Sequence, residues 1–205
     1  MSEKGDTKSK ILDAAEKLFG MNGFEATSLR DITTEADVNL AAINYHFQSK
    51  DSLIDAIVAR RIEPVSKRRV ELLDAAGPNP ALEVILAAFM APVMKVKTDA
   101  MVPLMGRILS NPDLFVDRVF LKHLAPVSQR FGEALSKALP DLPLADLLWR
   151  LHFSVAVMTH TMLWGRVYPK ITNGICDITD RDALVDRAVR FVAAGFRAPA
   201  SQESD

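Results

Sequence analysis

The chain has 205 residues, of which 49% are hydrophobic and 25% are charged, and its formal net charge is −1 at pH 7. These proportions are typical of a soluble globular protein and exclude a disordered or fibrous one. A single cysteine, Cys176, excludes an internal disulfide and a cysteine-built metal site, as expected of a protein in the reducing cytoplasm.

Two further features bear on location and partners. The N-terminal residues lack the apolar stretch of a secretion signal, and the longest charge-free run, between Arg150 and Arg166, is too short to span a bilayer comfortably. We therefore expect a cytoplasmic protein with no membrane contact. The first fifty residues hold six basic and eight acidic side chains, so a nucleic-acid function must rest on geometry instead of a basic surplus.

Hydrophobic residues recur at helical spacing through nearly the whole chain, and no segment alternates like a half-buried strand. The sequence therefore predicts an all-α fold. A first helix is expected over residues 7–22, and Gly23 supplies its stop signal. One face of this helix collects hydrophobic side chains suited to a core: Ile11, Leu12, Ala15, Leu18 and Phe19.

Two short helices follow, and capping residues mark their boundaries. Ser28 and Asp31 have the spacing of a capping box at the start of the second helix. Asp37 is among the few side chains that tolerate a left-handed backbone, which predicts a tight break. Asn39 then caps a third helix that ends near Phe47.

A fourth helix is expected from Ser49 towards residue 76, in spite of Pro64, and the Gly-Pro-Asn-Pro sequence at 77–80 ends it. Beyond this point the spacing predicts helical stretches at 80–97, 99–110, 112–139, 144–168 and 180–197. Prolines are expected to kink or break them at positions 92, 103, 126 and 140.

The third helix is predicted to present two different faces. Val38, Ile43 and Phe47 have the spacing of a buried stripe, whereas Leu40, Ala41 and Asn44 face outward. An exposed Leu-Ala pair suits a major groove, where small apolar groups touch thymine methyls, and Asn44 suits an adenine edge or a phosphate. A steeply crossed pair of short helices is typical of a helix-turn-helix, although on the residues alone plain helical packing is the more frequent explanation.

Side chains and helix N-termini that can bind phosphates surround this third helix. They are Thr27, Ser28, Arg30, Tyr45, His46 and Lys50. Plainer interpretations stay open for several of them: Tyr45 can face the core, His46 and Lys50 can be solvated surface residues, and Arg30 can pair with a neighbouring glutamate.

The run from Ile11 to Leu53 resembles the DNA-binding domain of the TetR family of ligand-responsive transcriptional repressors. The resemblance lies in Ile11–Phe19, Gly23-Phe24, Thr27–Ile32, Ala36–Val38, Asn44-Tyr45-His46-Phe47 and Ser49–Leu53. It implies DNA contacts by Thr27, Ser28, Arg30, Asn39, Leu40, Ala41, Asn44, Tyr45, His46 and Lys50. It also implies a three-helix helix-turn-helix DNA-binding domain at 1–48, a connecting helix at 49–77, and a ligand-binding and dimerisation domain at 78–205.

The sequence departs from this family pattern at three positions. Asp37 stands where the family usually has Gly, and Leu40 and Ala42 stand where it often has a polar residue and Thr. The operator sequence therefore cannot be taken from relatives. The segment 38–47 resembles one branch of the family, which includes regulators that respond to fatty acids or their thioesters, and this favours a fatty-acid-like effector.

The C-terminal part is rich in methionine and aromatic residues. Such residues more often fill a core than line a site, but the resemblance implies a pocket between these helices, and methionine adapts to varied partners. The candidate ligand-binding residues are Phe89, Met90, Met94, Met101, Met105, Phe120, Trp149, His152, Phe153 and Trp164. His152 and His160 are too far apart for a typical metal pair, so we expect no metal and no cofactor.

The expected helices at 144–168 and 180–197 can pack inward only or form a four-helix interface with a second copy, which the resemblance favours. We thus expect a homodimeric repressor that binds a palindromic operator in double-stranded DNA and releases it when a small, largely apolar effector binds. The sequence shows no catalytic motif, so an enzyme is not expected. A helical adaptor without DNA contact, and activation in place of repression, remain alternatives.

Overall fold

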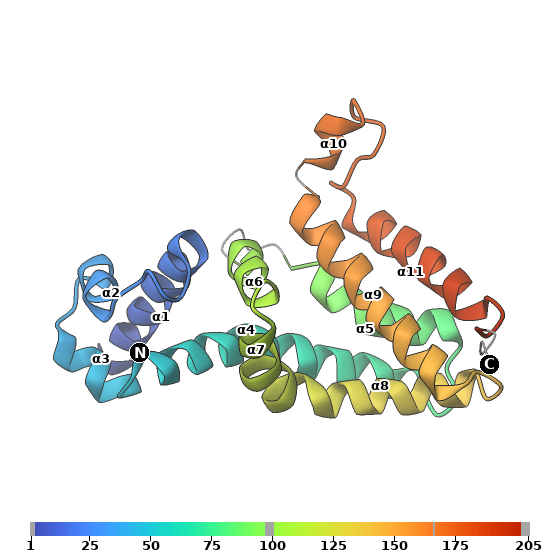
Figure 1. Cartoon of the computed structure of the whole chain (residues 1–205), viewed down its shortest axis with the longest axis horizontal. Coiled ribbons are helices and arrows are strands. Elements are labelled where there is room, and N and C mark those ends of the chain that lie inside the picture. The colour runs from blue at the N-terminus through green and yellow to red at the C-terminus, as the bar shows by residue number, and fades with distance from the viewer. Residues whose placement is uncertain (1–2, 97–100, 166, 202–205) are drawn as a thin grey trace. The chain divides into compact units, whose positions relative to one another are not determined.

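The computed structural model describes residues 3–96, 101–165 and 167–201, without the side chains of residues 3–5, 101, 102 and 114. These residues form helices joined by short connections and contain no strand, which confirms the all-α prediction (Figure 1). The chain divides into two compact units. The first comprises residues 1–64 and 98–123, and the second comprises residues 65–97 and 124–205.

The first unit is built from the N-terminal helices and a segment from the middle of the chain. Its elements are α1 (Glu3–Asn22), α2 (Leu29–Ala36), α3 (Leu40–Phe47), the first part of α4 (Lys50–Ala75), α6 (Met101–Leu109), α7 (Pro112–Leu114) and the π-helix η1 (Phe115–Leu124). The expected core residues Ile11, Ala15 and Phe19 are fully buried, as are Ile32 and Ile43. The predicted boundaries of the first four helices are confirmed to within a few residues.

The middle segment was expected to belong to the C-terminal domain, but the structure places it in the first unit. α6 packs on α1, where Arg107 Nη2 donates to the carbonyl oxygen of Met21 at 3.2 Å. In η1, Arg118 pairs with Asp51 and Asp55 of α4, each at 2.9 Å. The expected linear division at residues 48 and 77 is therefore not the division into compact bodies. It stays a prediction about functional domains.

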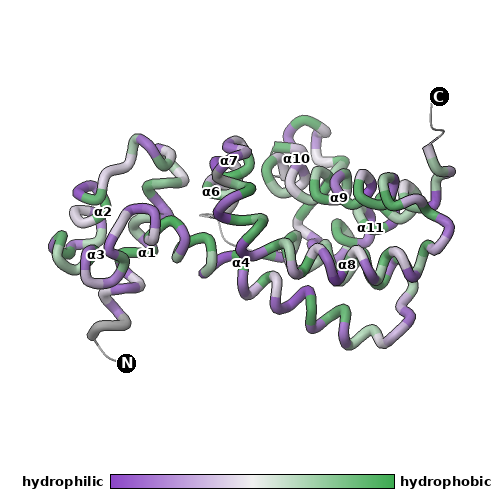
Figure 2. Tube along the Cα trace, turned by 60° about the horizontal axis from the view of Figure 1, so that its bottom comes forward, coloured by the Kyte–Doolittle hydropathy of each residue, from purple (hydrophilic) through white to green (hydrophobic). Residues whose placement is uncertain are grey.

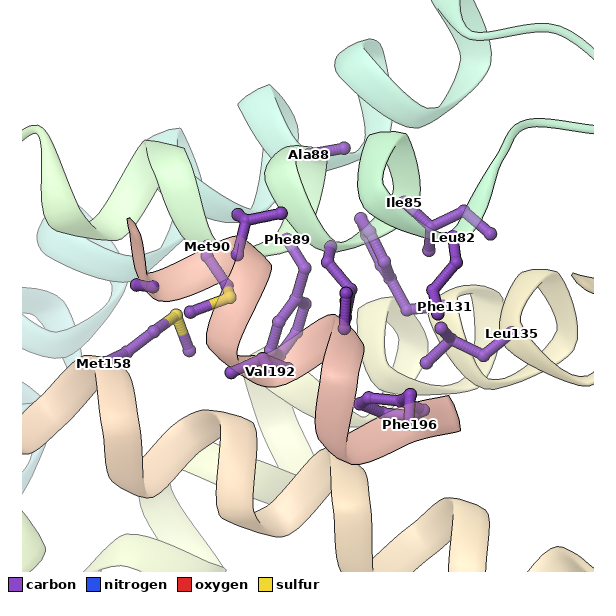
Figure 3. Close-up of a cluster of buried hydrophobic side chains, with 14 of the residues drawn as sticks. Leu82, Ile85, Ala88, Phe89, Met90, Phe131, Leu135, Met158, Val192 and Phe196 are labelled. Atoms are coloured by element: carbon purple, nitrogen blue, oxygen red, sulfur yellow. The ribbon is translucent and has the colours of Figure 1, made fainter. Parts of the chain in front are cut away.

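The second unit packs its helices around one hydrophobic core. It contains the end of α4, α5 (Leu82–Met94), α8 (Ala125–Ala138), α9 (Leu144–Trp164), α10 (Tyr168–Ile171) and α11 (Arg181–Arg197). α11 packs against α5 and α9, and α8 packs against α5 and α9. Figure 3 shows Phe89, Phe131, Val192 and Phe196 meeting between these helices, where each is nearly fully buried.

None of the helices within the described ranges combines the length and the apolar character that crossing a membrane requires. Three prolines lie at helix positions where their missing N–H has a visible consequence. Pro64 and Pro92 interrupt the hydrogen-bond ladders of α4 and α5 from within, and Pro126 stands at the start of α8 directly after the π-helix.

Candidate nucleic-acid interface

The start of α2 is held by a complete capping box. The backbone N–H of Asp31 donates to Ser28 Oγ at 3.2 Å, and the backbone N–H of Ser28 donates to Asp31 Oδ2 at 2.8 Å. The hydrogen bond from the Ser28 backbone, followed by that from its hydroxyl, lowers the pKa of Asp31 below its ordinary value. Ser28 is therefore an exposed residue at a helix N-terminus, where free amide groups favour an anion.

The break between α2 and α3 is made by a residue in the left-handed conformation, as expected. Asp37 has φ 51° and ψ 54°, and its N–H donates to the carbonyl oxygens of Thr33 and Thr34. Asn39 then caps α3, since its Oδ1 accepts the N–H of Ala42 at 2.9 Å. These two local interactions set the short turn from which α3 begins.

The two predicted faces of α3 are confirmed, except that Val38 precedes the helix and is only half-buried. Ile43 and Phe47 are buried, whereas Leu40, Ala41 and Asn44 are exposed. A helix of eight residues thus turns an apolar pair and an amide outward, which is a composition suited to base edges in a major groove.

Three further candidates lie at the C-terminal end of α3 and the start of α4. Tyr45 is exposed, and its ring meets His46 edge-on with 5.0 Å between ring centroids. Ser49 caps α4 by accepting the N–H of Ser52 at 3.1 Å. Lys50, the first residue of α4, is half-buried and stands at this second helix N-terminus.

The structure corrects the expected role of Thr27. Its side chain is 0% exposed, and its hydroxyl donates to the carbonyl oxygen of Gly23 at 2.8 Å. A buried hydroxyl that is already bonded to the end of α1 cannot reach a phosphate. Thr27 therefore joins α1 to the start of α2, and the contact surface at this point is left to Ser28 and Arg30.

Ion pairs inside the first unit explain how an acidic N-terminal region can still present positive charge. Lys10 pairs with Asp6 at 3.0 Å, Lys17 with Glu35 at 2.6 Å, Arg60 with Asp13 at 2.6 Å, and Arg61 with Glu16 at 2.7 Å. Arg60 and Arg61 come from beyond the first fifty residues, so a count over that range misses them.

Within the described part of this unit, three lysine and arginine side chains meet neither a carboxylate nor a backbone carbonyl. They are Lys8, Arg30 and Lys50. Arg30 forms no ion pair with a neighbouring glutamate among the described residues. Glu35, one of the possible partners, pairs with Lys17. The unpaired positive charges are thus those that remain available to phosphates.

Lys8 is a residue that the sequence interpretation missed. Its Nζ lies 5.9 Å from the centre of the Phe47 ring, at the end of α3. On α1 alone it has the pattern of an ordinary solvated lysine. Only the packing of α1 beside α3 identifies it as a candidate for a phosphate contact.

The ten candidate ligand-binding residues do not gather around one pocket, so they cannot act together as one site, and the role of each stays a prediction. Phe89, Met90 and Met94 are buried in the core of the second unit. Met105 and Phe120 belong to the first unit, and the side chain of Met101 lies outside the described residues.

The remaining four candidates lie on the exposed surface of α9. Trp149 is 60% exposed and stacks on Phe153, which is 56% exposed, with 5.8 Å between ring centroids. His152 is exposed, not buried, and Trp164 stacks on the exposed His160. A pocket wall would be shielded from solvent, so this region has the character of a surface and not of an enclosed site.

This surface continues from α9 onto α11. An open groove of about 790 Å³ is lined by Trp149, Arg150, Phe153, Val157, Phe191, Val192, Gly195 and Phe196, among others. Phe191 is 71% exposed, and Leu144 and Leu148 extend the apolar area along α9. Figure 2 shows hydrophobic residues recurring along both helices. Exposed apolar area of this extent is typical of a protein interface.

No three His, Cys, Asp or Glu side chains come together as a possible metal site in the ranges that the structure describes. Cys176 is exposed.

Two family models match the chain. The model for bacterial regulatory proteins of the tetR family matches residues 11–57, and the model for the tetracyclin repressor-like C-terminal domain matches residues 87–195. The first match covers α2, α3 and the start of α4, where the exposed candidates lie. The second covers more than half of the chain and most of the second unit.

Individual relatives resemble the N-terminal region in sequence. The probable HTH-type transcriptional regulator YttP of Bacillus subtilis is 44% identical over 64 residues, 31% of each chain. The HTH-type nicotine-responsive transcriptional repressor HdnoR of Paenarthrobacter nicotinovorans is 32% identical over 69 residues, 34% of this chain and 36% of the relative. The matched region thus spans about a third of the length of these curated relatives.

A solved structure resembles the chain over nearly its whole length. It is a bacterial regulatory protein in the tetR family from Rhodococcus RHA1, with a TM-score of 0.67 and 19% sequence identity. The match covers 97% of this chain and 100% of that chain. At this identity the likeness shows a shared fold.

Proposed function

The chain belongs to the TetR family of bacterial transcriptional regulators, and from that premise we propose that it is a cytoplasmic repressor which binds a palindromic operator as a homodimer and is released by a small, largely apolar ligand. DNA-binding regulation of transcription is the family's activity. The operator contacts, the dimer and the ligand response belong to the proposal.

The observation that carries the proposal is the exposed face of α3. Leu40, Ala41 and Asn44 face outward from a helix whose other face is buried, and Asn39 caps its start. We assign base contacts to this face, and phosphate contacts to Ser28, Arg30, Tyr45, His46 and Lys50, as the sequence predicted, with Lys8 added. Two-fold symmetry would place two such helices one DNA turn apart.

Selection of bound sequences from a random DNA pool by the purified protein tests operator binding. We expect recovery of a palindromic motif. Asn44→Ala should relax the preferred base at one position, and Lys50→Ala should weaken binding to all sequences and reduce the salt slope by about 1. Lys137→Ala, an exposed lysine of α8, is the matched control and should leave both unchanged. Folded protein that selects no motif and binds as well after Asn44→Ala would contradict the proposal.

The exposed surface of α9 and α11 supports the homodimer. A second copy is the occupant we propose, because one eight-residue reading helix offers little affinity whereas two linked helices can match a palindrome. The alternative that these helices serve only inward packing leaves Trp149, Phe153 and Phe191 in water without a reason.

The ligand response is proposed as a population shift. A ligand that prefers the conformation with separated reading helices lowers the population that binds operator. HdnoR, whose name describes it as a nicotine-responsive repressor, supports an effector for this chain as well. The coupling must be reciprocal, so saturating operator must weaken ligand binding by the factor with which ligand weakens operator binding. Ligand affinity that stays unchanged in the presence of saturating operator would exclude this mechanism.

Activation is the second candidate, since operator position relative to a promoter decides the sign of regulation. Transcription from a template that carries the selected operator, with and without protein, separates the two. An enzymatic role is not proposed, because the family's members are DNA-binding regulators and the described residues present no catalytic constellation.

A further inference from the structure

The second unit buries a cationic side chain in its hydrophobic core. Arg69 extends from the second half of α4 and is only 6% exposed. Its Nε donates to the carbonyl oxygen of Phe89 at 2.7 Å, and its guanidinium lies 4.2 Å from the centre of the Phe89 ring. Burial lowers the pKa of Arg69 to about 10, so the side chain remains charged at neutral pH.

This guanidinium lacks a counter-ion. Among the described residues no carboxylate pairs with Arg69, and desolvation is the sole influence on its pKa. Its Nη2 has the thioether sulfur of Met158 as acceptor, at 3.9 Å. Sulfur is a weak acceptor, and a buried charge without a partner is costly, so the position requires an explanation.

A structural role explains one of its donors. Pro92 lies inside α5 and has no N–H to give to the carbonyl oxygen of Ala88, so the helix ladder is interrupted one residue before Phe89. Arg69 Nε supplies a donor to that carbonyl. This role uses only the Nε–H of Arg69. It does not explain why the terminal nitrogens of the guanidinium are placed in an apolar core, where Nη2 faces the Met158 sulfur.

A buried hydroxyl without a hydrogen-bond partner among the described residues lies one helical turn away. Ser66 precedes Arg69 by three residues on α4, a spacing that places two side chains on the same helix face. Its hydroxyl is buried, and no hydrogen-bond partner is found for it in the described part of the chain. A buried serine in a helix ordinarily donates to a carbonyl of the preceding turn, so this hydroxyl is an independent sign of a missing acceptor.

The surroundings of these two groups are apolar and adaptable. Figure 3 shows Met90, Met158 and Phe89 together at one end of the core cluster. Methionine side chains change conformation at low cost and can make room for a ligand. Among the residues that the structure describes, Arg69 is the only buried lysine or arginine. The site therefore holds one positive charge and matches a ligand with one negative charge.

We infer that Arg69 and Ser66 form the head-group site for an effector that joins a single carboxylate to an apolar body. The carboxylate takes the place of the Met158 sulfur at the guanidinium and accepts the Ser66 hydroxyl, while the apolar body packs among Phe89, Met90 and Met94. This inference rests on the proposal that the second unit binds an effector. It names the chemistry of that effector and the residues that recognise it.

Calorimetric titration of the full-length protein, without DNA, tests the inference directly. The probes are straight-chain carboxylates from hexanoate to hexadecanoate, each compared with the primary alcohol of the same length. We expect at least one carboxylate to bind, and its alcohol to bind roughly 10- to 100-fold more weakly, because the alcohol cannot form the charge-assisted hydrogen bonds.

Substitutions identify the groups responsible. Arg69→Met should abolish the difference between acid and alcohol, and Ser66→Ala should weaken only the acid, by about 3- to 10-fold. Arg69→Lys keeps the charge and should retain part of the preference. Arg130→Met, an exposed arginine of α8, is the matched control and should leave binding unchanged.

Binding of no carboxylate in the series, equal affinity for acid and alcohol, or an acid preference that survives Arg69→Met would each overturn the inference. Operator binding is measured separately on the same variants. A carboxylate that depends on Arg69 but leaves operator binding unchanged would support the head-group site and contradict the release mechanism proposed above.

Discussion

The two units treat buried charge in opposite ways, and two arginines of α4 show the difference. In the first unit Arg61 meets Glu16, which is only 2% exposed, at 2.7 Å. In the second unit Arg69 is more deeply buried, and none of the carboxylates that the structure describes pairs with it. A buried charge is tolerated when it is paired. We interpret the paired arginine as part of the scaffold and the unpaired one as a group that receives its partner from outside the chain.

The surfaces of the two units also differ in the kind of side chain that they expose. On the first unit, internal ion pairs consume most cations and, among the described residues, leave Lys8, Arg30 and Lys50 without a carboxylate partner. On the second, Trp149, Phe153 and Phe191 expose apolar area without a partner. These groups support the partners proposed for the two surfaces: an anionic one for the first unit and an apolar one for the exposed face of the second.

The largest expected effect concerns the two arginines. Arg61→Met leaves Glu16 buried without its partner and should lower the free energy of unfolding by about 3 kcal/mol. This value is the lower end of the range for breaking a buried ion pair, because Arg61 is 23% exposed. Arg69→Met should change it by less than about 1 kcal/mol or raise it, because the desolvation cost of an unpaired charge offsets its hydrogen bond. Urea denaturation measures both. Equal losses in the two variants would erase the contrast between the units.

A smaller effect is expected at the apolar surface. Phe191→Glu introduces a charge at the centre of the proposed interface and should yield monomers whose operator affinity is weaker by about 100-fold or more, since the second reading helix is lost. Light scattering gives the mass, and fluorescence anisotropy gives the affinity. Val84→Glu, a similarly apolar exposed position on α5, is the control and should remain dimeric. A dimeric Phe191→Glu variant would refute this assignment of the interface.

Neighbouring hydroxyls at the start of α2 provide a finer test of the first unit. Thr27→Val removes a buried hydrogen bond and should cost about 1 kcal/mol of stability while leaving operator affinity unchanged. Ser28→Ala should cost a similar amount through the lost cap and should also weaken operator binding. Loss of affinity in Thr27→Val at a temperature where it is fully folded would restore Thr27 to the contact surface.

The smallest effect is a dependence on acid. The pKa of Asp31 is lowered by its hydrogen bonds from Ser28. Burial raises the pKa of Asp55, but hydrogen bonds from Lys122 and Arg118 outweigh burial and lower it. A lowered folded-state pKa stabilises the fold above the unfolded pKa, and this stabilisation is lost as the pH falls through the folded value.

Thermal unfolding should therefore move to lower temperature below about pH 4. The fall should be smaller in Asp55→Asn, which has no carboxylate to protonate at this position. An identical pH profile in that variant would show that the ion pairs with Arg118 and Lys122 contribute nothing measurable.

Much of the proposed DNA-contact surface, the exposed face of α3 and the residues around it, was predictable because its geometry is local. The capping box at Ser28, the left-handed Asp37 and the cap at Asn39 each involve residues within a few positions of one another. The spacing of Ile43 and Phe47 then decides which face of α3 is exposed. Thr27 was misjudged although its decisive contact is also local, because the resemblance gave it a DNA contact while its hydroxyl donates to the carbonyl oxygen of Gly23, four residues earlier.

The C-terminal candidates were less predictable, since helical spacing shows which residues share a face but not what covers that face. Trp149 and Phe89 look alike in sequence, yet one is exposed on α9 and the other lies in the core. Arg69 has the pattern of one more charge in a basic stretch of α4. Only the packing of α5 and α9 on that helix reveals that it is buried beside Phe89 and Met158.

The sequence by itself determined the all-α class, the positions of the first four helices and the resemblance of the first fifty residues to a DNA-binding domain, because caps, breaks and periodicity act over a few residues. It did not predict that residues 112–139 divide into α7, the π-helix η1 and α8. Tertiary structure decided the membership of 101–123 in the first unit, the pairing of cations with distant carboxylates and the burial of Arg69. These depend on contacts between residues far apart in the chain, which no local pattern records.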